Sequence, residues 1–229
     1  MRKVFALAVA LTLAFLGSSS TATAQWTFRF KPVIGGKEIL PDSCYLLSHN
    51  NKTVCISTLK FYISGMVLKN EKNKIIKEKN SFHLINIQDT NSLTLSPQFS
   101  NNFQALSLQF FLGIDSITNS AGVQGGCLDP MQGMYWTWLS GYINLKLEGH
   151  YPSDSTSFQY HLGGYRAPFN TLQTVEIEIP NKKYIEIPID IEHIFSQTDA
   201  SFPDHIMSPG KEAMQLSKLT ATMFPSSVK

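Results

Sequence analysis

The chain has 229 residues, enough for a sizeable core, and its 19 basic and 17 acidic residues nearly balance. This balance excludes the strongly basic surface typical of nucleic-acid-binding proteins. The first residues have the layout of a secretory signal peptide: Arg2 and Lys3, an apolar run that ends at Leu16, and an Ala-x-Ala sequence closing at Ala24. We therefore expect cleavage after Ala24 and an exported, periplasmic or extracellular protein.

Residues 25–229 are predicted to form a single domain with no membrane span, because no later apolar run reaches the roughly 20 residues that a bilayer core requires. Alternation of apolar and polar residues dominates and is typical of strands with one buried face. The expected strands are, in chain order, 27–31, 58–68, 82–87, 106–114, 134–147, 157–162, 175–179 and 184–193.

Two of these strands carry a residue that interrupts regular pairing. Gly65 interrupts the strand 58–68. Pro188 lies within 184–193, where isoleucines alternate with acidic residues as in a half-buried antiparallel strand. Because proline cannot donate a ladder hydrogen bond, Pro188 predicts an edge strand or a bulge.

The remaining elements are a loop and one helix. The lysine- and asparagine-rich residues 70–80 are predicted to be a solvated hairpin loop. A C-terminal helix is indicated by Ser208 as its cap, Pro209 in its first turn, and apolar residues at helical spacing up to Met223. Together these elements predict an all-β, antiparallel, Ig-like β-sandwich with a short C-terminal helix.

Three cysteines are too few for a disulfide-rich scaffold. Cys44 and Cys55 flank a polar turn, and a hairpin there brings them within bonding reach if their Cα atoms come close, which spacing alone does not establish. Cys127 would remain as a buried or reactive thiol.

Two of the three tryptophans, Trp136 and Trp138, lie one residue apart. In one regular strand over 134–147, both would face the polar side. A bulge at Ser140 and Gly141 would reverse the phase and send both into the core. A long glycine-rich loop, 113–134, precedes them, and long irregular loops in compact domains are usually functional or disordered.

This region resembles the signature of the MbnP-like family, exported copper-binding proteins associated with methanobactin and other copper-handling systems. The resemblance rests on the pattern G-x-LDP-x-x-GM-x-WTW-x-SGYI across residues 126–143. It extends to LKFYISGMVL (59–68), FQYHLGGY (158–165) and IMSPGKEAMQLSKLTATMF (206–224), and so covers nearly all of residues 25–229. Cys127 departs from the acidic or polar residue more usual there.

The resemblance implies that Trp136 is oxidised to kynurenine by a diheme MauG-like enzyme of the cytochrome c peroxidase type. It also implies that the protein holds copper as Cu(I), a metal that suits imidazole ligands and low coordination numbers. The family therefore assigns copper as the cofactor and a diheme enzyme as the partner. Trp138, by proximity alone, is expected to relay charge or to shield the site.

His161 and His83 are the candidate histidine ligands. His161 stands on the less apolar side of its strand within the family-like HLGG sequence, and His83 could approach Trp136 from a neighbouring strand. Each could equally be a structural histidine. No H-x-H, C-x-x-C or H-x-x-x-H spacing occurs, so the sequence itself offers little support for a metal site.

The other histidines have simpler interpretations. His193 is expected to end the apolar face of its strand as a structural residue, and His49 and His150 are expected to lie in turns. His205 and Met207 form a His-x-Met pair whose imidazole and thioether suit Cu(I), although a loop before the helix explains them equally well.

The sequence bears on three other function classes. An Ig-like interaction module could bind a protein or glycan through an exposed aromatic strand that includes Trp138. Calcium binding by Asp115, Asn119 and Asp129 would use oxygen ligands, but their spacing fits no EF-hand. Enzymatic activity is not expected, because the sequence contains no nucleophile elbow, no H-E-x-x-H and no glycine-rich phosphate loop.

Overall fold

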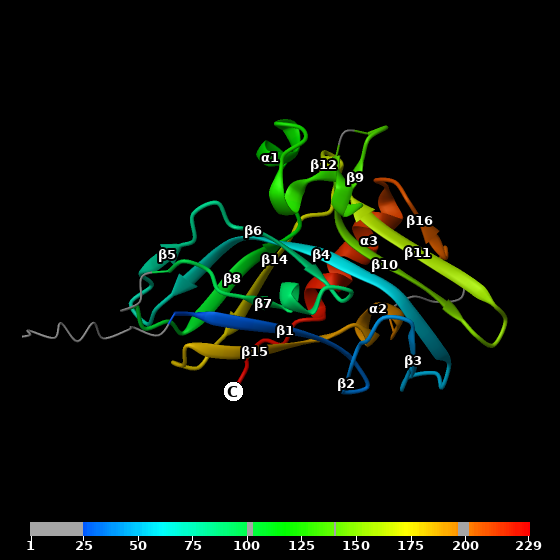
Figure 1. Ribbon diagram of the computed structural model, residues 1–229, viewed down its shortest axis with the longest axis horizontal. Helices are drawn as coiled ribbons and strands as arrows, with labels where there is room; N and C mark the ends of the chain where they lie inside the picture. Colours follow the sequence, from blue (N-terminus) through cyan, green and yellow to red (C-terminus); the bar gives the residue numbers. More distant parts are fainter. Residues whose placement is uncertain (1–24, 100–102, 140, 197–201) are drawn as a thin grey trace, which may run out of the picture.

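The computed structural model describes residues 25–99, 103–139, 141–196 and 202–229. The predicted signal peptide, residues 1–24, lies outside them. Strands form a large curled sheet and a small sheet that enclose one core between them (Figure 1). Within the described ranges, no helix is long and apolar enough to cross a membrane.

The large sheet is centred on its longest strand, β4 (Thr53–Lys69). Its main path runs β14-β8-β4-β10-β11-β16, and β3, β5 and β6 also pair with β4 while β9 pairs with β10. The bounds of these strands are β3 Ser43–Leu46, β5 Ile75–Lys77, β6 Phe82–Asn86, β8 Ser107–Leu112, β9 Tyr135–Trp136, β10 Gly141–Tyr151, β11 Thr156–Gly163, β14 Gln173–Glu178 and β16 His205–Ile206.

The interruption expected at Gly65 is a shift in the β4–β8 register between Ser64 and Val67. Gly65 has φ +60°, and a Cβ there would lie 2.8 Å from the Phe111 ring, so both conformation and space favour glycine. The solvated hairpin predicted over residues 70–80 is present: β5 lies within these residues and pairs with β4 as the return arm of the hairpin.

The small sheet has the order β15-β1-β2, with β7 also paired to β1. Its strands are β1 Thr27–Ile34, β2 Lys37–Glu38, β7 Thr94–Leu95 and β15 Tyr184–Asp190, and a separate pair joins β12 Tyr165–Arg166 to β13 Phe169–Asn170. The edge position predicted from Pro188 is confirmed, since β15 ends the sheet. The antiparallel prediction for this strand was wrong: β15 runs parallel to β1. Alternation shows which face is buried and carries no information about the direction of the partner.

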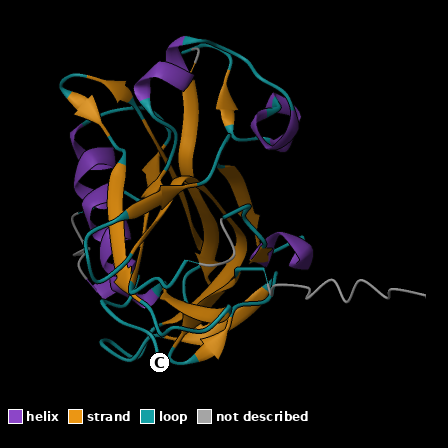
Figure 2. Ribbon diagram, turned by 90° about the vertical axis from the view of Figure 1, so that its left-hand side faces the viewer, coloured by secondary structure: helices purple, strands orange, loops and turns teal. Residues whose placement is uncertain are grey.

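The helices are few and mostly short. They are α1 Ser116–Ser120, α2 Glu192–Ser196, α3 Lys211–Thr222 and the 3-10 turns η1 Thr90–Leu93, η2 Gly126–Leu128 and η3 Pro130–Gln132. The C-terminal helix α3 is confirmed and lies along one side of the strands (Figure 2). Its predicted start was wrong: the N-cap is Gly210, which makes no side-chain cap bond, and Ser208 lies before it.

Two hydrophobic clusters lie on opposite faces of the large sheet. The main core, between the sheets, takes alternate residues such as Phe61 of β4, Leu147 of β10 and Tyr160 of β11. We call the opposite side the outer face. The loop cluster covers one end of it and consists of Tyr62, Ile114, Leu128, Met134, Trp136, Tyr142 and Ile143. The sandwich-like all-β fold with a terminal helix is thus confirmed, and residues 113–139 form a cap over the outer face.

Candidate metal centre

The two neighbouring tryptophans lie on a tight hairpin. Trp136 in β9 pairs with Gly141 in β10, and Tyr135 pairs with Tyr142. The chain therefore reverses across residues 137–140, of which Ser140 lies outside the described part. The prediction of one strand over 134–147 was wrong, because the alternation typical of a strand continues through residues that form a turn.

The hairpin gives the two tryptophans different environments. Trp136 is 6% exposed and belongs to the loop cluster, whereas Trp138 is 65% exposed. Their ring centroids are 5.8 Å apart. Neither of the two predicted arrangements, both on the polar face or both in the core, describes the pair.

Trp136 lies directly over Gly163, near the end of β11. A Cβ at Gly163 would stand 2.5 Å from a ring carbon of Trp136, closer than real Cβ atoms approach. Glycine at this position therefore makes the room that the indole ring occupies. His161 lies two residues earlier on β11, and side chains two apart in a strand share a face.

His161 is buried and held by a carboxylate. Its Nε2 lies 2.6 Å from Oε1 of Glu148 on the neighbouring strand β10. Burial, followed by the charge of Lys146, lowers the pKa of His161 even though the hydrogen bond to Glu148 opposes the shift. Burial alone would raise the pKa of Glu148, but hydrogen bonds from His161 and Thr58 bring it below its usual value. At neutral pH the pair is therefore a neutral imidazole beside an ionised carboxylate.

This pairing fixes the orientation of the ring. An ionised carboxylate can only accept, so Nε2–H of His161 donates to Glu148 and the lone pair of the neutral ring lies on Nδ1. Metal-binding histidines commonly donate their second ring N–H to a carboxylate in this way. The donor set thus fits a metal that accepts a neutral nitrogen ligand.

Two lysines tie the cap to the sheet beside this pair. Lys146 Nζ donates to the carbonyl of Gly133 at 2.7 Å, and Lys60 Nζ donates to the carbonyl of Gln132 at 3.1 Å. Burial lowers the pKa of Lys146; the charge of Glu148 opposes this shift and nearby Lys60 adds to it. Both ammonium groups therefore position the segment that leads into Trp136.

His83, the other candidate ligand, lies elsewhere. On β6, Phe82 and Leu84 pack against the loop cluster, and alternation turns His83 to the other face, opposite Ile63 of the main core. Its Nε2 lies 2.8 Å from Oε2 of Glu78, which also accepts from Ser81. The structure does not bring His83 and Trp136 together.

The remaining histidines contact other parts of the fold. His49 lies 3.3 Å from the buried Glu192 carboxylate, which ties its turn to α2. His193 lies 3.9 Å from Asp190, His150 pairs with Cys55 in the ladder, and His205 is exposed in β16. Among the residues that the structure describes, no group of three or more His, Cys, Asp or Glu side chains is arranged to hold a metal.

The three candidate calcium ligands form hydrogen bonds with the backbone. Asp115 accepts from Thr118 as the cap of α1, and Asp129 accepts from the amide of Met131. Asn119 is buried, donates to the carbonyl of Ile114 and accepts from the amide of Tyr142. These contacts account for the three side chains as parts of the cap.

The cysteines take two different roles. Cys44 and Cys55 face each other in the β3–β4 ladder and form a disulfide with a Cα separation of 3.9 Å. Cys127 is free and half-buried against the loop cluster, where its Sγ lies 3.2 Å from the carbonyl of Phe82. Burial raises the pKa of the Cys127 thiol, which disfavours the reactive thiolate.

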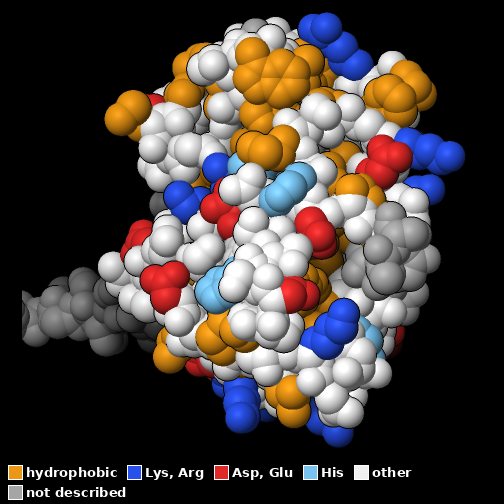
Figure 3. Space-filling model, turned by 90° about the vertical axis from the view of Figure 1, so that its right-hand side faces the viewer, with side chains coloured by type: hydrophobic (Ala, Val, Ile, Leu, Met, Phe, Trp, Pro, Cys, Tyr) orange, Lys and Arg blue, Asp and Glu red, His pale blue; other side chains and the backbone are white. Residues whose placement is uncertain are grey.

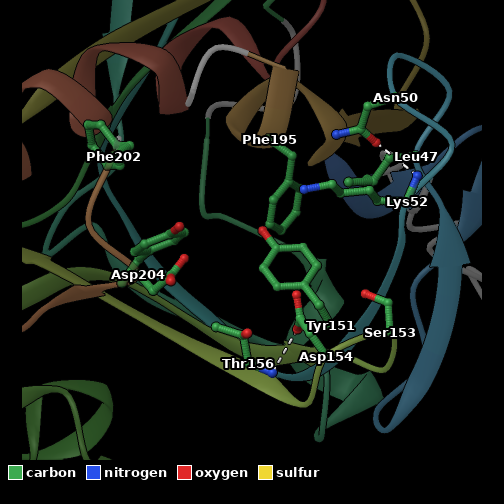
Figure 4. A pocket seen from close by; sticks show the side chains of 11 residues that line it. Leu47, Asn50, Lys52, Tyr151, Ser153, Asp154, Thr156, Phe195, Phe202 and Asp204 are labelled. Carbon is green, nitrogen blue, oxygen red and sulfur yellow. Dashed lines mark hydrogen bonds between the residues drawn. The ribbon is translucent and has the colours of Figure 1, made fainter. Parts of the chain in front are cut away.

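Two cavities lie at opposite ends of the β10–β11 hairpin. One of about 140 Å³ is lined by Trp136, Gly164, Arg166, Phe169 and Pro209, among others. The other, about 270 Å³, lies near the hairpin turn, where Tyr151, Phe195 and Lys52 converge (Figure 4). Burial, then Asp204 and Asp154, raise the pKa of Tyr151 to about 12. The lining of this second cavity contains no histidine.

Sequence reasoning missed two residues of the centre. One is Glu148: the sequence does not single it out, although its position opposite Gln159 and two residues from Lys146 sets it beside His161. Gly163 was noticed only as part of HLGG. A glycine two residues after a histidine in a strand was the available signal that another side chain approaches that face.

The comparisons with known proteins agree with this fold. The family model described as MbnP matches residues 23–211. No curated protein matches the chain. A solved structure of MbnP from Methylosinus trichosporium is similar in fold, with a TM-score of 0.54 and 15% sequence identity over 76% of this chain and 78% of that one. The family match covers most of the chain, which therefore belongs to the MbnP family.

Proposed function

We propose that the protein is an exported Cu(I)-binding protein of copper homeostasis, whose Trp136 is oxidised to kynurenine by a diheme MauG-like partner. The observation that carries the proposal is the buried Trp136 ring over Gly163, two residues along β11 from a histidine oriented by Glu148. In this proposal the protein is the substrate of the modifying enzyme and has no catalytic activity of its own.

The chemistry of the donors supports copper. A neutral imidazole nitrogen is a ligand suited to Cu(I), and His161 offers Nδ1. Kynurenine replaces the indole by a ketone and an aryl amine, both able to reach a metal that indole cannot bind. His161 and residue 136 would thus hold the copper, with Glu148 as the positioning residue.

The unequal exposure of the tryptophans supports a partner enzyme. Trp136 is too buried for direct contact with a protein oxidant, whereas exposed Trp138 lies with its centroid 5.8 Å away. Trp138 would therefore carry electrons from Trp136 to the bound partner.

The cap also offers apolar surface for such a partner. Figure 3 shows hydrophobic side chains gathered at the end of the molecule where Figure 1 places α1, β9 and β12. The exposed apolar residues of the cap are Ile117, Val123, Met131, Trp138 and Leu139.

The test is to produce the protein with and without a MauG-like diheme enzyme. Peptide mass spectrometry should find a net gain of one oxygen and loss of one carbon at Trp136 only in the coproduced sample. That sample should bind Cu(I) more tightly in a competition with a chromophoric Cu(I) chelator.

Matched variants locate the ligands. His161→Gln should lose Cu(I) affinity, while His193→Gln, an exposed histidine beside Asp190, should not. Unmodified Trp136 in the coproduced sample, together with no bound copper, would contradict the proposal.

A second candidate function is an interaction module that binds a protein or glycan. It is favoured by exposed Trp138, by Phe169 at 38% exposure, and by the small apolar cavity that Phe169 and Trp136 line. Trp138→Ala should then abolish partner or glycan binding with metal content unchanged. Loss of copper together with partner binding would argue against this alternative.

A further inference from the structure

We propose that Met207 and His205 join His161 in a soft-metal site of two imidazoles and one thioether at the edge between β11 and β16. The inference rests on the proposed function for the identity of the metal as Cu(I). It adds ligands that come from the C-terminal part of the chain, far in sequence from the tryptophan hairpin.

The pairing of β16 sets the direction of these side chains. β16 runs parallel to β11, with Gln159 beside His205 and Tyr160 beside Ile206. Ile206 and Tyr160 are both buried in the main core. Side chains alternate along a strand, so His205 lies on the outer face, the same face as His161. Continuing the alternation by one residue past the end of β16 puts Met207 on that face as well.

The register then places Met207 next to His161. Tyr160 pairs with Ile206, and His161 and Met207 are the residues that follow them on the two neighbouring segments. The chain stays beside β11 beyond this point, because the Cβ of Pro209 lies 3.1 Å from where a Cβ of Gly164 would stand. Neighbouring strands lie about 4.8 Å apart, a spacing that the side chains of methionine and histidine easily bridge.

The same segment leads to the cavity beside Trp136. Pro209, two residues after Met207, lines the 140 Å³ cavity together with Trp136. Met207 thus lies on the segment between His205 and the tryptophan cavity, alongside His161.

The exposure and chemistry of the two residues suit capture of a metal. Met207 is 47% exposed, although a thioether is apolar, and His205 is exposed as well. The carboxylate of Glu148 already accepts from His161. The available donors are therefore neutral and soft, a set that favours Cu(I) over hard divalent ions.

The experiment uses chain 25–229 with 13C-labelled methionine methyl groups, produced without any diheme enzyme and titrated with Ag(I), a redox-stable soft analogue of Cu(I). We expect one methyl resonance to shift, and Met207→Leu should remove that resonance. Met207→Leu and His205→Gln should each weaken Ag(I) and Cu(I) binding by about tenfold or more.

Controls separate the site from the fold and from the modification. Met131→Leu changes a methionine that is 92% exposed on the cap and should alter neither the shift nor the affinity. Trp136→Phe should keep the Met207 shift. Amide spectra of each variant check that the fold is intact.

The outcomes distinguish the two proposals. If another methyl group shifts, if none shifts, or if Met207→Leu binds as tightly as the wild type, the His-x-Met site is wrong. If the Met207 shift is present but Trp136 stays unmodified with the diheme enzyme, the site stands and the oxidation proposal fails.

Discussion

Two histidine–glutamate pairs in the large sheet have nearly the same geometry and different surroundings. His161 lies 2.6 Å from Glu148, and His83 lies 2.8 Å from Glu78. The first pair stands on the outer face, next to the glycine that Trp136 covers. The second lies on the other face of β6, where Ser81 shares the Glu78 carboxylate and also accepts from the amide of Met66.

The difference teaches that a carboxylate-oriented imidazole is not by itself a metal site. Glu78 closes a local network within the β5–β6 connection, so its histidine has a structural task. Glu148 connects two strands and leaves the histidine beside an aromatic ring and a parallel edge strand. Position relative to other donors separates the two pairs.

The largest effect is expected from filling the space at Gly163. Gly163→Val would drive its side chain into Trp136 and into the carbonyl of Tyr142, 2.7 Å from a Cβ. We expect a loss of about 3 kcal/mol in the free energy of unfolding, the range for overpacking. Gly125→Ala, in open space at φ −96°, is the control. If urea unfolding found the two variants equally stable, the tight contact between Gly163 and Trp136 would be contradicted.

The next largest effect is expected from replacing each of the two carboxylates by an amide. Glu148→Gln should lower Cu(I) affinity by about tenfold to a hundredfold, as loss of an orienting partner does. Glu78→Gln should leave that affinity unchanged and cost about 1–3 kcal/mol of stability, because it weakens bonds to a buried carboxylate. Chelator competition and urea unfolding measure the two effects. Equal Cu(I) affinities for the two variants would contradict the view that only the His161–Glu148 pair binds the metal.

A smaller effect is expected from pH. The folded-state pKa of His161 lies below 6.5, so its protonation favours the unfolded chain. The stability contributed by neutral His161 is complete above pH 6.5 and is lost as the pH falls toward the folded pKa. Between pH 7 and 5, His161→Gln should flatten the decline of the unfolding free energy. A slope unchanged by His161→Gln would show that the pKa of this imidazole is not lowered.

The smallest stability effect concerns Trp138. Trp138→Phe should change the unfolding free energy by less than about 0.5 kcal/mol, because the ring is mostly exposed. It should nevertheless slow oxidation of Trp136 by the diheme enzyme, followed by mass spectrometry over time. Oxidation at the wild-type rate would rule out the relay.

The sequence predicted every described strand of five or more residues, because alternation directly reports a face that is buried, and it missed most of the shorter strands. It failed where the chain reverses without changing the pattern, as at Trp138, and where an unseen partner decides direction, as at Tyr184–Asp190. The helix start was misplaced because Ser208 and Pro209 fit a cap by composition, while their segment continues alongside β11.

The candidate site was predictable only in part. Resemblance indicated Trp136 and His161, and both lie in one region. The partner of His161 and the separation of His83 from Trp136 depend on register and on which face of a strand is turned outward. A shift of one residue in the register of β11 would turn His161 to the core face.

The two lysines that hold the cap, Lys60 and Lys146, would also repel a cation that binds beside them. The ammonium groups of Lys60 and Lys146 lie on the same face as His161, and the charge of Lys146 already disfavours a proton on that ring. Coulomb repulsion scales with the charge of the ion, so a dication is penalised about twice as strongly as a monocation. For an ion bound at His161, the two ammonium groups would therefore disfavour Cu(II) and Zn(II) relative to Cu(I), an effect that the Glu148 carboxylate opposes, and neutralising Lys146 should weaken this preference.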